Sequence, residues 1–240
     1  MRSALFASEN LEKESERPGL RLQNSKMLKI ELNGECMART GAMVAYQGHV
    51  QFQALGSGGI GKFLKQKLTG EGVPLMRLTG QGDVFLAHDA ADVHLIDLEH
   101  GDALSINGSS VLAFDSTLQY DIKMVQGLGM LSAAGMFNCV FTGQGRIAVT
   151  TQGTPVVLNV DQPTYVDPQA AVCWSASLQT GYHRAEQLGI GTLLGRRTGE
   201  AFTMSFAGQG FVVVQPSEEP PAAGMGDQQN GGVLGGLFGD

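Results

Sequence analysis

The chain has 240 residues, enough to bury a substantial core, and carries a formal net charge of −7. Charged residues make up only 16% of it, whereas 34 residues are glycine. The acidic balance argues against a polyanion-binding protein, which needs a basic surface. The low charge argues against a bundle of charged amphipathic helices.

Residues 1–21 are polar and mix both charge signs, without the apolar centre of a signal peptide. No stretch of the sequence approaches the roughly 18 apolar residues of a membrane-spanning helix. The three cysteines, Cys36, Cys139 and Cys173, are widely spaced and odd in number, which argues against a disulfide framework or a zinc knuckle. We therefore expect a cytoplasmic protein with buried free thiols.

Short runs rich in β-branched and aromatic residues, separated by turn signals, predict strands along most of the chain. In chain order the predicted strands are residues 27–32, 43–46, 50–55, 75–78, 84–87, 93–98, 111–114, 118–124, 138–141, 147–150, 156–160, 172–174, 178–182, 202–206 and 211–214. The dipeptides Asn33-Gly34 and Asn107-Gly108 are typical of turns, and we expect a turn at each.

Three stretches have an apolar spacing nearer 3.6 than 2 and predict short helices, at residues 60–69, 125–136 and 185–194. Each stretch contains a glycine at the same repeat position: Gly61, Gly129 and Gly189. Glycine inside a helix costs about 1 kcal/mol relative to alanine, so its recurrence indicates a packing reason. A helix without a side chain at that point can lie close against a sheet or another helix.

The motif Gly-Gln-Gly occurs three times, each time between two apolar runs. Its members are Gly80, Gln81, Gly82, Gly143, Gln144, Gly145, Gly208, Gln209 and Gly210. An aromatic residue precedes each copy, and the helical glycine follows that residue by fifteen positions; the aromatic residues are Tyr46, Phe114 and Trp174. Three markers in one order, three times over, predict an internal triplication with a repeat of roughly 65 residues.

Glycines inside a near-continuous apolar run usually mark a bulge or a sharp bend where a strand turns a corner. Three equivalent corners predict three equivalent sheets in a pseudo-threefold arrangement. The glutamine between each pair of glycines is placed to hydrogen-bond to the backbone at the corner. A ring of three ligand-binding amides is the less favoured alternative.

The triplicated units, the Gly-x-Gly corners, the glycine-rich helices and the segment 41–46 (Gly-Ala-Met-Val-Ala-Tyr) together resemble the AIM24 family over residues 20–215. The resemblance implies an all-β fold of double-stranded β-helix type, related to the tryptophan RNA-binding attenuation protein, with three units in one chain and chains that assemble into rings. It also implies a link to membranes, since the fungal mitochondrial member is linked to inner-membrane organisation and respiratory assembly. None of the family markers is a catalytic signature, so no active-site residues are carried over.

We therefore predict an all-β fold with short helices, in which three internal repeats form a pseudo-threefold arrangement of double-stranded β-helix type. An N-terminal extension covers residues 1–19, and the triplicated domain covers residues 20–215. The expected units are about 20–82, 83–145 and 146–215. Residues 216–240, rich in glycine and proline, predict a disordered tail.

Three histidines stand six residues apart with aspartates between them: His88, His94 and His100. A metal site of the kind found in cupins would need a His-x-His pair, which this chain lacks. Side chains six residues apart on one extended strand are roughly 20 Å apart. We interpret these histidines as surface and loop residues, with a metal site as the alternative, and predict no cofactor.

The search for other chemistry finds no catalytic constellation. Cys139 and Cys173 lie in apolar runs and are interpreted as core residues. The glycine-rich stretch 56–59 lacks the Lys-Ser or Lys-Thr of a phosphate-binding loop. The three aromatic markers also lie in apolar strands and are interpreted as core; basic residues do not recur beside them, so no nucleic-acid partner is expected.

The predicted helices carry small and apolar residues, and the end of the predicted tail is apolar for such a segment. The candidate interaction residues are Met130, Leu131, Met136, Leu237 and Phe238. We predict a non-enzymatic oligomeric scaffold or adaptor that associates with itself, a trimer being favoured. The alternatives are a peripheral protein at the inner face of the membrane that supports envelope organisation, and a small-ligand or metal-binding β-helix protein. An unidentified protein is the further candidate partner.

Overall fold

The computed structural model describes residues 3, 7–13, 18–55, 73–124, 137–183 and 203–217, and the structural statements below concern these residues. Almost all of their regular structure is antiparallel β-strand, so the predicted all-β class is confirmed. Helical structure in these ranges is limited to two 3₁₀ turns, Ser8–Asn10 and Gly108–Ser110. No helix in the described part is long and apolar enough to cross a membrane.

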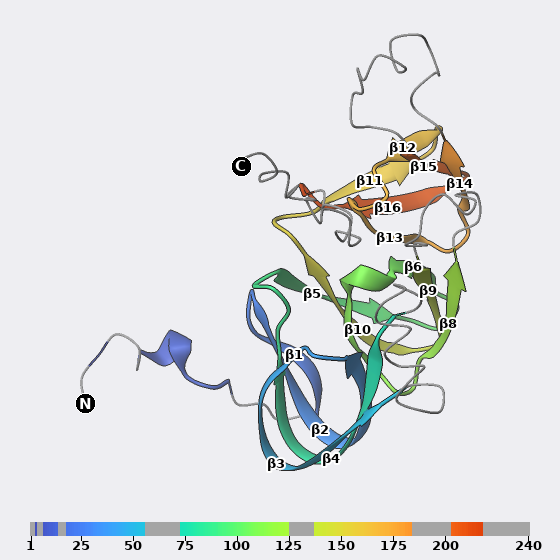
Figure 1. The fold of residues 1–240 in the computed structure, drawn as a ribbon. Coiled ribbons are helices and arrows are strands. Elements are labelled where there is room, and N and C mark those ends of the chain that lie inside the picture. Colours follow the sequence, from blue (N-terminus) through green and yellow to red (C-terminus); the bar gives the residue numbers. More distant parts are fainter. Residues whose placement is uncertain are drawn as a thin grey trace, which may run out of the picture.

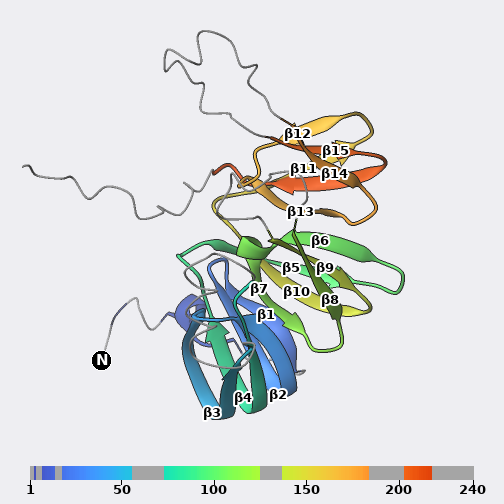
Figure 2. The same ribbon diagram turned by 45° about the vertical axis from the view of Figure 1, so that its right-hand side comes forward.

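The strands are numbered in chain order, as labelled in Figures 1 and 2. Their bounds are β1 Gly19–Asn24, β2 Met27–Arg39, β3 Met43–Ala54, β4 Leu75–Leu86, β5 Asp92–Leu98, β6 Ala103–Asn107, β7 Val111–Asp115, β8 Gln119–Met124, β9 Phe137–Thr142, β10 Gly145–Thr151, β11 Val156–Val160, β12 Thr164–Val166, β13 Ala171–Ser175, β14 Gln179–His183, β15 Thr203–Ala207 and β16 Gly210–Val214.

The strands form three antiparallel sheets. A seven-stranded sheet has the order β3-β4-β2-β7-β10-β5, with β1 also paired to β2. A six-stranded sheet has the order β11-β16-β13-β6-β9-β8, and a three-stranded sheet has the order β12-β15-β14. The sheets follow one another along the molecule, so that β3 and β12 lie at opposite ends in both views (Figures 1 and 2).

The predicted turn at Asn33-Gly34 is wrong, because β2 runs without a break from Met27 to Arg39. Gly34 has a φ of 117° and pairs with Gly80 of β4, whose φ is 120°. Two facing glycines in a backbone region that other residues rarely adopt let both strands bend without ending. In the other two Gly-Gln-Gly motifs the first glycine also has a positive φ, 99° at Gly143 and 122° at Gly208, and there the strand is interrupted.

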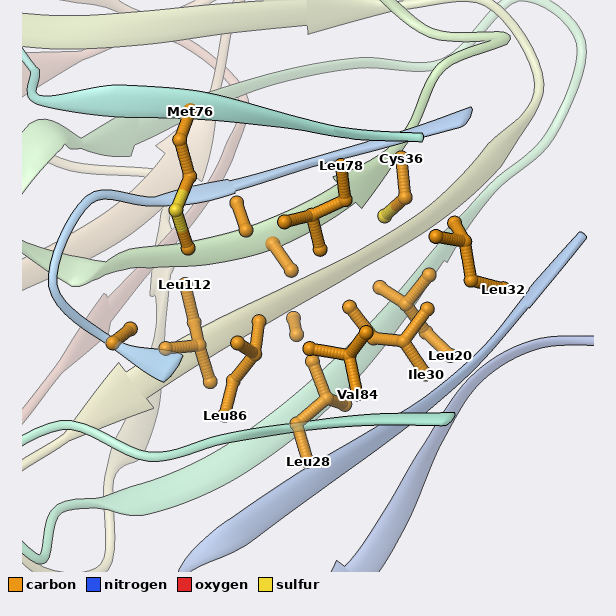
Figure 3. Close-up of a cluster of buried hydrophobic side chains, with 14 of the residues drawn as sticks. Leu20, Leu28, Ile30, Leu32, Cys36, Met76, Leu78, Val84, Leu86 and Leu112 are labelled. Carbon is orange, nitrogen blue, oxygen red and sulfur yellow. The ribbon is translucent and has the colours of Figure 1, made fainter. Parts of the chain in front are cut away.

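Three clusters of buried apolar side chains form the core. The first packs leucines of β2 and β4 against Leu112 of β7 (Figure 3). The second contains Phe114 and Phe141, whose rings meet edge-to-face at 4.9 Å between centroids. The third contains Trp174 and Phe206, in the same arrangement at 5.5 Å. Such aromatic pairs stabilise the fold by about 1 kcal/mol beyond their burial.

The aromatic markers do not share one environment. Phe114 and Trp174 are fully buried, as expected for core residues. The interpretation of Tyr46 as a core residue is wrong, because this side chain is 49% exposed. Tyr46 lies on β3, the terminal strand of its sheet in the described part of the chain, and no further strand there covers it.

A buried ammonium group ties the N-terminal segment to the first sheet. The side chain of Lys29 is only 4% exposed, and its Nζ lies 2.6 Å from Glu12 Oε1. The same Nζ donates a hydrogen bond to the Lys13 carbonyl at 3.0 Å. Gln23 adds two hydrogen bonds, accepting from Lys13 N and donating to the Leu11 carbonyl. Residues 11–13 are therefore held against β1 and β2.

The three predicted helices and nearly all of the predicted tail lie outside the described residues. The same holds for the repeat glycines and the candidate interaction residues placed on them, which are Gly61, Gly129, Gly189, Met130, Leu131, Met136, Leu237 and Phe238.

Candidate interaction surface

The three histidines of the predicted metal alternative do not converge. His94 Nε2 lies 2.9 Å from Thr151 Oγ1 on the neighbouring strand, and His88 Nε2 lies 3.4 Å from Asp89 Oδ2. His100 is exposed at the turn after β5. In the described ranges, no three His, Cys, Asp or Glu side chains come close enough together to hold a metal ion.

A small polar recess lies beside His88. Its walls include Ser110, Thr150 and Gln215, and the space open to the centre of a water molecule is about 10 Å³. That volume holds about one water molecule. The recess can therefore hydrate these polar groups, but it has no room for an organic ligand.

The three thiols are buried in the core and are not disposed as nucleophiles. Burial raises the pKa of Cys36, Cys139 and Cys173 to about 12 in each case. Cys36 Sγ also donates a hydrogen bond to the Phe114 carbonyl at 3.2 Å. Because the thiolate is the reactive form, these groups behave as small apolar side chains at neutral pH.

The Gly-Gln-Gly corners are shaped by backbone contacts. A Cβ on Gly80 would lie 2.1 Å from the His49 carbonyl oxygen, and one on Gly82 would lie 2.1 Å from the Gln47 carbonyl oxygen. Only glycine allows β3 to approach β4 so closely. The glutamines of the three motifs, Gln81, Gln144 and Gln209, are exposed.

The most unusual surface is β3 itself. All of its residues except Val50 are exposed, yet it carries the large apolar side chains Met43, Val44, Tyr46 and Phe52. Tyr46 and Phe52 meet edge-to-face at 5.2 Å, so part of this surface is already ordered. We call the outer side of this strand the β3 edge.

In the described part of the chain, the β3 edge has no covering strand, charged residue or proline of the kind that commonly protects a terminal strand. Natural proteins cover such edges or place charged residues and prolines on them, because an open edge recruits other strands. The twelve residues of β3 include neither proline nor any Asp, Glu, Lys or Arg. An uncharged, exposed strand that carries several large apolar side chains is a typical protein-binding element.

The opposite end of the molecule has a similar strand. β12 is the terminal strand of the three-stranded sheet within the described residues, and Tyr165 at its centre is 54% exposed. Its three residues, Thr-Tyr-Val, carry no charge. We call the outer side of this strand the β12 edge. The neighbouring terminal strand β11 also exposes Val156 and Val157.

Known proteins share this architecture. A family model described as mitochondrial biogenesis AIM24 matches residues 20–217, which is most of the chain. The chain belongs to the AIM24 family. The crystal structure of protein SPYM3_0169 from Streptococcus pyogenes superposes on this AIM24-family chain with a TM-score of 0.64. The two are 19% identical, and the match covers 84% of this chain and 94% of the other, which establishes the similarity of fold alone. No curated protein matches the chain by sequence.

The sequence predicts an interaction surface on the helices and at the end of the tail, and it does not predict the β3 and β12 edges. A signal for them was present: an apolar strand without a charged residue inside a chain that is only modestly apolar. Such a strand can be recognised as an exposed edge only when its neighbours in the sheet are known.

Proposed function

We propose that this protein is a non-enzymatic scaffold whose copies associate with one another through open strand edges. The observation that carries the proposal is the β3 edge, an exposed strand of twelve residues with four large apolar side chains and no charge. Removing apolar side chains of this size from water contributes about 1.5–3 kcal/mol for each one that becomes fully buried. Association would therefore relieve an otherwise unfavourable surface.

The proposal includes a chain built from three similar units. In each, a central strand or strand pair lies between two antiparallel neighbours: β4 between β2 and β3, β9–β10 between β5–β6 and β7–β8, and β15–β16 between β11–β12 and β13–β14. Corresponding aromatic pairs support the equivalence. Tyr46–Phe52 and Phe114–Tyr120 have centroid distances of 5.2 and 5.0 Å and interplanar angles of 68° and 65°.

The units follow one another in a row, and successive units are joined by strand pairing, β2 with β7 and β6 with β13. This arrangement departs from a closed pseudo-threefold ring within one chain, because the first and last units lie at opposite ends (Figure 1). The double-stranded β-helix description of the unit remains a prediction. A trimer of chains remains the favoured assembly.

Sedimentation equilibrium over a wide range of protein concentrations tests the proposal. We expect a mass that is a multiple of 25.3 kDa, three-fold in the favoured case, and that falls as the protein is diluted. A mass of 25.3 kDa at every concentration would contradict self-association.

A further inference from the structure

Two junctions between successive units have the same strand register. Where β2 meets β7, Met37 pairs with Phe114; where β6 meets β13, Ser105 pairs with Trp174. Both aromatic residues are the repeat markers noted in the sequence. The junctions therefore place the same repeat position of one unit against the same repeat position of the next.

The corner glycines show that these positions correspond. Phe114 lies opposite Ile147 and Trp174 lies opposite Val212, in each case two residues after the second glycine of a Gly-Gln-Gly motif. Tyr46 lies opposite Val84, which is also two residues after such a glycine. Tyr46 is thus the counterpart of the two buried aromatic residues.

Counting residues from the Gly-Gln-Gly motifs also identifies the residue on the partner strand of each junction. Met37 and Ser105 lie opposite Arg77 and Val140, each three residues before the first glycine of its motif. In the last unit, Tyr165 of β12 lies opposite Ser205, three residues before Gly208. β12 therefore corresponds to the segments of β2 and β6 that form the two internal junctions.

A shared irregularity supports the alignment. The pairing of β3, β7 and β13 with their central strands shifts at one point, so that a single residue is skipped. The skipped residues are Val44, Leu112 and Val172. Leu112 and Val172 are at most 1% exposed, whereas Val44 is 52% exposed. A β-bulge at the same position in three strands indicates that it belongs to the structure of the unit. Only in β3 is the residue at the bulge exposed.

The matched positions differ in exposure between the internal junctions and the two terminal strands. At the internal junctions Phe114, Trp174, Met37 and Ser105 are at most 5% exposed. The corresponding side chains on the strands that are terminal in the described part of the chain, Tyr46 and Tyr165, are 49% and 54% exposed. The difference follows from the position of the unit in the chain, because the local strand pairing is the same.

We propose that the β12 edge of one copy pairs with the β3 edge of the next, in the register of the two internal junctions. This inference rests on the proposed self-association and specifies its interface. Antiparallel pairing then sets Thr164 opposite Gln47, Tyr165 opposite Tyr46 and Val166 opposite Ala45 of the second copy. Neither edge carries a charge that would oppose the contact.

A second copy is the occupant because one chain cannot bring its own two edges together across the length of the molecule (Figures 1 and 2). The combined sheet would have the order β14-β15-β12-β3-β4-β2. In the observed six-stranded sheet the corresponding strands have the same order, β8-β9-β6-β13-β16-β11. Such a head-to-tail contact builds a closed ring or an open filament, depending on the rotation between copies.

Disulfide trapping tests the register. Paired residues of antiparallel strands have Cα atoms about 4.5–5.5 Å apart, within the range that a disulfide spans. We would mix a Tyr46→Cys protein with a Tyr165→Cys protein under mild oxidation and measure covalent dimer on a non-reducing gel. The native thiols stay out of the reaction because they are buried, with pKa values of about 12.

We expect at least about tenfold more covalent dimer in the mixture than in either variant alone, because only the mixture brings the two positions within disulfide reach. A Phe52→Cys protein mixed with Tyr165→Cys is the matched control; Phe52 is an exposed β3 residue six positions from Tyr46, and it should give no dimer above background. Equal yields from the two mixtures would overturn the register.

Two further outcomes would overturn the head-to-tail pairing. Covalent dimer from Tyr46→Cys alone would show that two β3 edges pair with each other. An oligomeric wild-type mass without covalent dimer in the mixture would reject this junction and leave the proposed self-association standing. A monomeric wild-type mass would reject both.

Discussion

The ammonium of Lys29 and the carboxylate of Glu12 form the shortest contact of a charge cluster around the buried Lys29, with 2.6 Å between Nζ and Oε1. Glu31 and Asp83 each place a carboxylate oxygen 3.5 Å from the same Nζ. A charge that is removed from water needs this kind of compensation. The cluster therefore couples the docking of residues 11–13 to the ionisation of its members.

The pH dependence of this docking follows from two pKa shifts. The hydrogen bond from Lys29 holds the pKa of Glu12 below its ordinary value of 4.5. The pair therefore stabilises the fold fully above about pH 4.5, and that stability is lost as the pH falls through the lower folded pKa. Burial alone would lower the pKa of Lys29, but the hydrogen bond of Glu12 and the charges of Asp83, Glu12 and Glu31 raise it. The contribution of Lys29 is present below 10.5 and is lost at higher pH.

We predict that Glu12→Gln lowers the free energy of unfolding by about 1 kcal/mol at pH 7, and that the difference shrinks as the pH falls below 4.5 and vanishes below the lower folded pKa of Glu12. Urea titrations of both proteins at several pH values measure this. Glu99→Gln, which removes an exposed carboxylate elsewhere, should have little effect at any pH. A loss that stayed constant down to pH 3 would show that the charge of Glu12 is not the cause.

The facing glycines of β2 and β4 allow a matched pair of substitutions. Gly34 and Gly80 have nearly equal φ angles of 117° and 120°, but an added Cβ meets nothing within 4 Å at Gly34 and a backbone oxygen at 2.1 Å at Gly80. We predict a loss of about 1–2 kcal/mol for Gly34→Ala from backbone strain alone. Gly80→Ala should cost about 3 kcal/mol or more, because β3 must move away. Equal midpoints in chemical denaturation would contradict the close approach of β3.

Most strands could be predicted from the sequence because runs such as those of β5 and β16 are apolar, β-branched and bounded by turn residues. β12 and β6 were missed since β12 has only three residues and β6 interrupts its apolar residues with a buried serine. The turn assigned to Gly34 was wrong because a glycine that ends a strand and one that bends it look alike in sequence.

The sequence signal for the candidate surface could not be decisive by itself, for a physical reason. Tyr46 and Phe114 each lie in an apolar run, and each pairs with a residue two positions after a Gly-Gln-Gly motif. Tyr46 is exposed and Phe114 is buried because β3 is a terminal strand in the described part of the chain, whereas β7 lies between β2 and β10. A repeated sequence pattern does not say which of its copies lies on a terminal strand.

Corresponding residues in these two environments should respond differently to the same truncation. We predict that Leu112→Ala lowers the free energy of unfolding by about 2–5 kcal/mol, because it leaves a cavity in the core. Val44→Ala should change the stability of the isolated chain by less than about 0.5 kcal/mol and instead weaken association. Thermal denaturation at low concentration, together with the dilution series, separates the two effects. A large loss for Val44→Ala in the monomer would place it in an internal core.

The buried thiols should be unreactive in the native protein. At pH 8 a pKa of about 12 in place of 9 leaves about a thousandfold less thiolate. We expect an aromatic disulfide reagent to modify none of the three thiols within minutes in buffer and all three in denaturant. Rapid modification of one thiol without denaturant would show that its strand opens readily.

The central claim is that copies join through the β3 and β12 edges. Light-scattering mass measurements at one concentration on the wild type, Tyr46→Lys and Val157→Lys test it most directly. Both substitutions place a charge at an exposed apolar position of a terminal strand, but only Tyr46 lies in the proposed junction. We predict the same multiple of 25.3 kDa for the wild type and Val157→Lys, and 25.3 kDa for Tyr46→Lys. One oligomeric mass for all three proteins would contradict the claim.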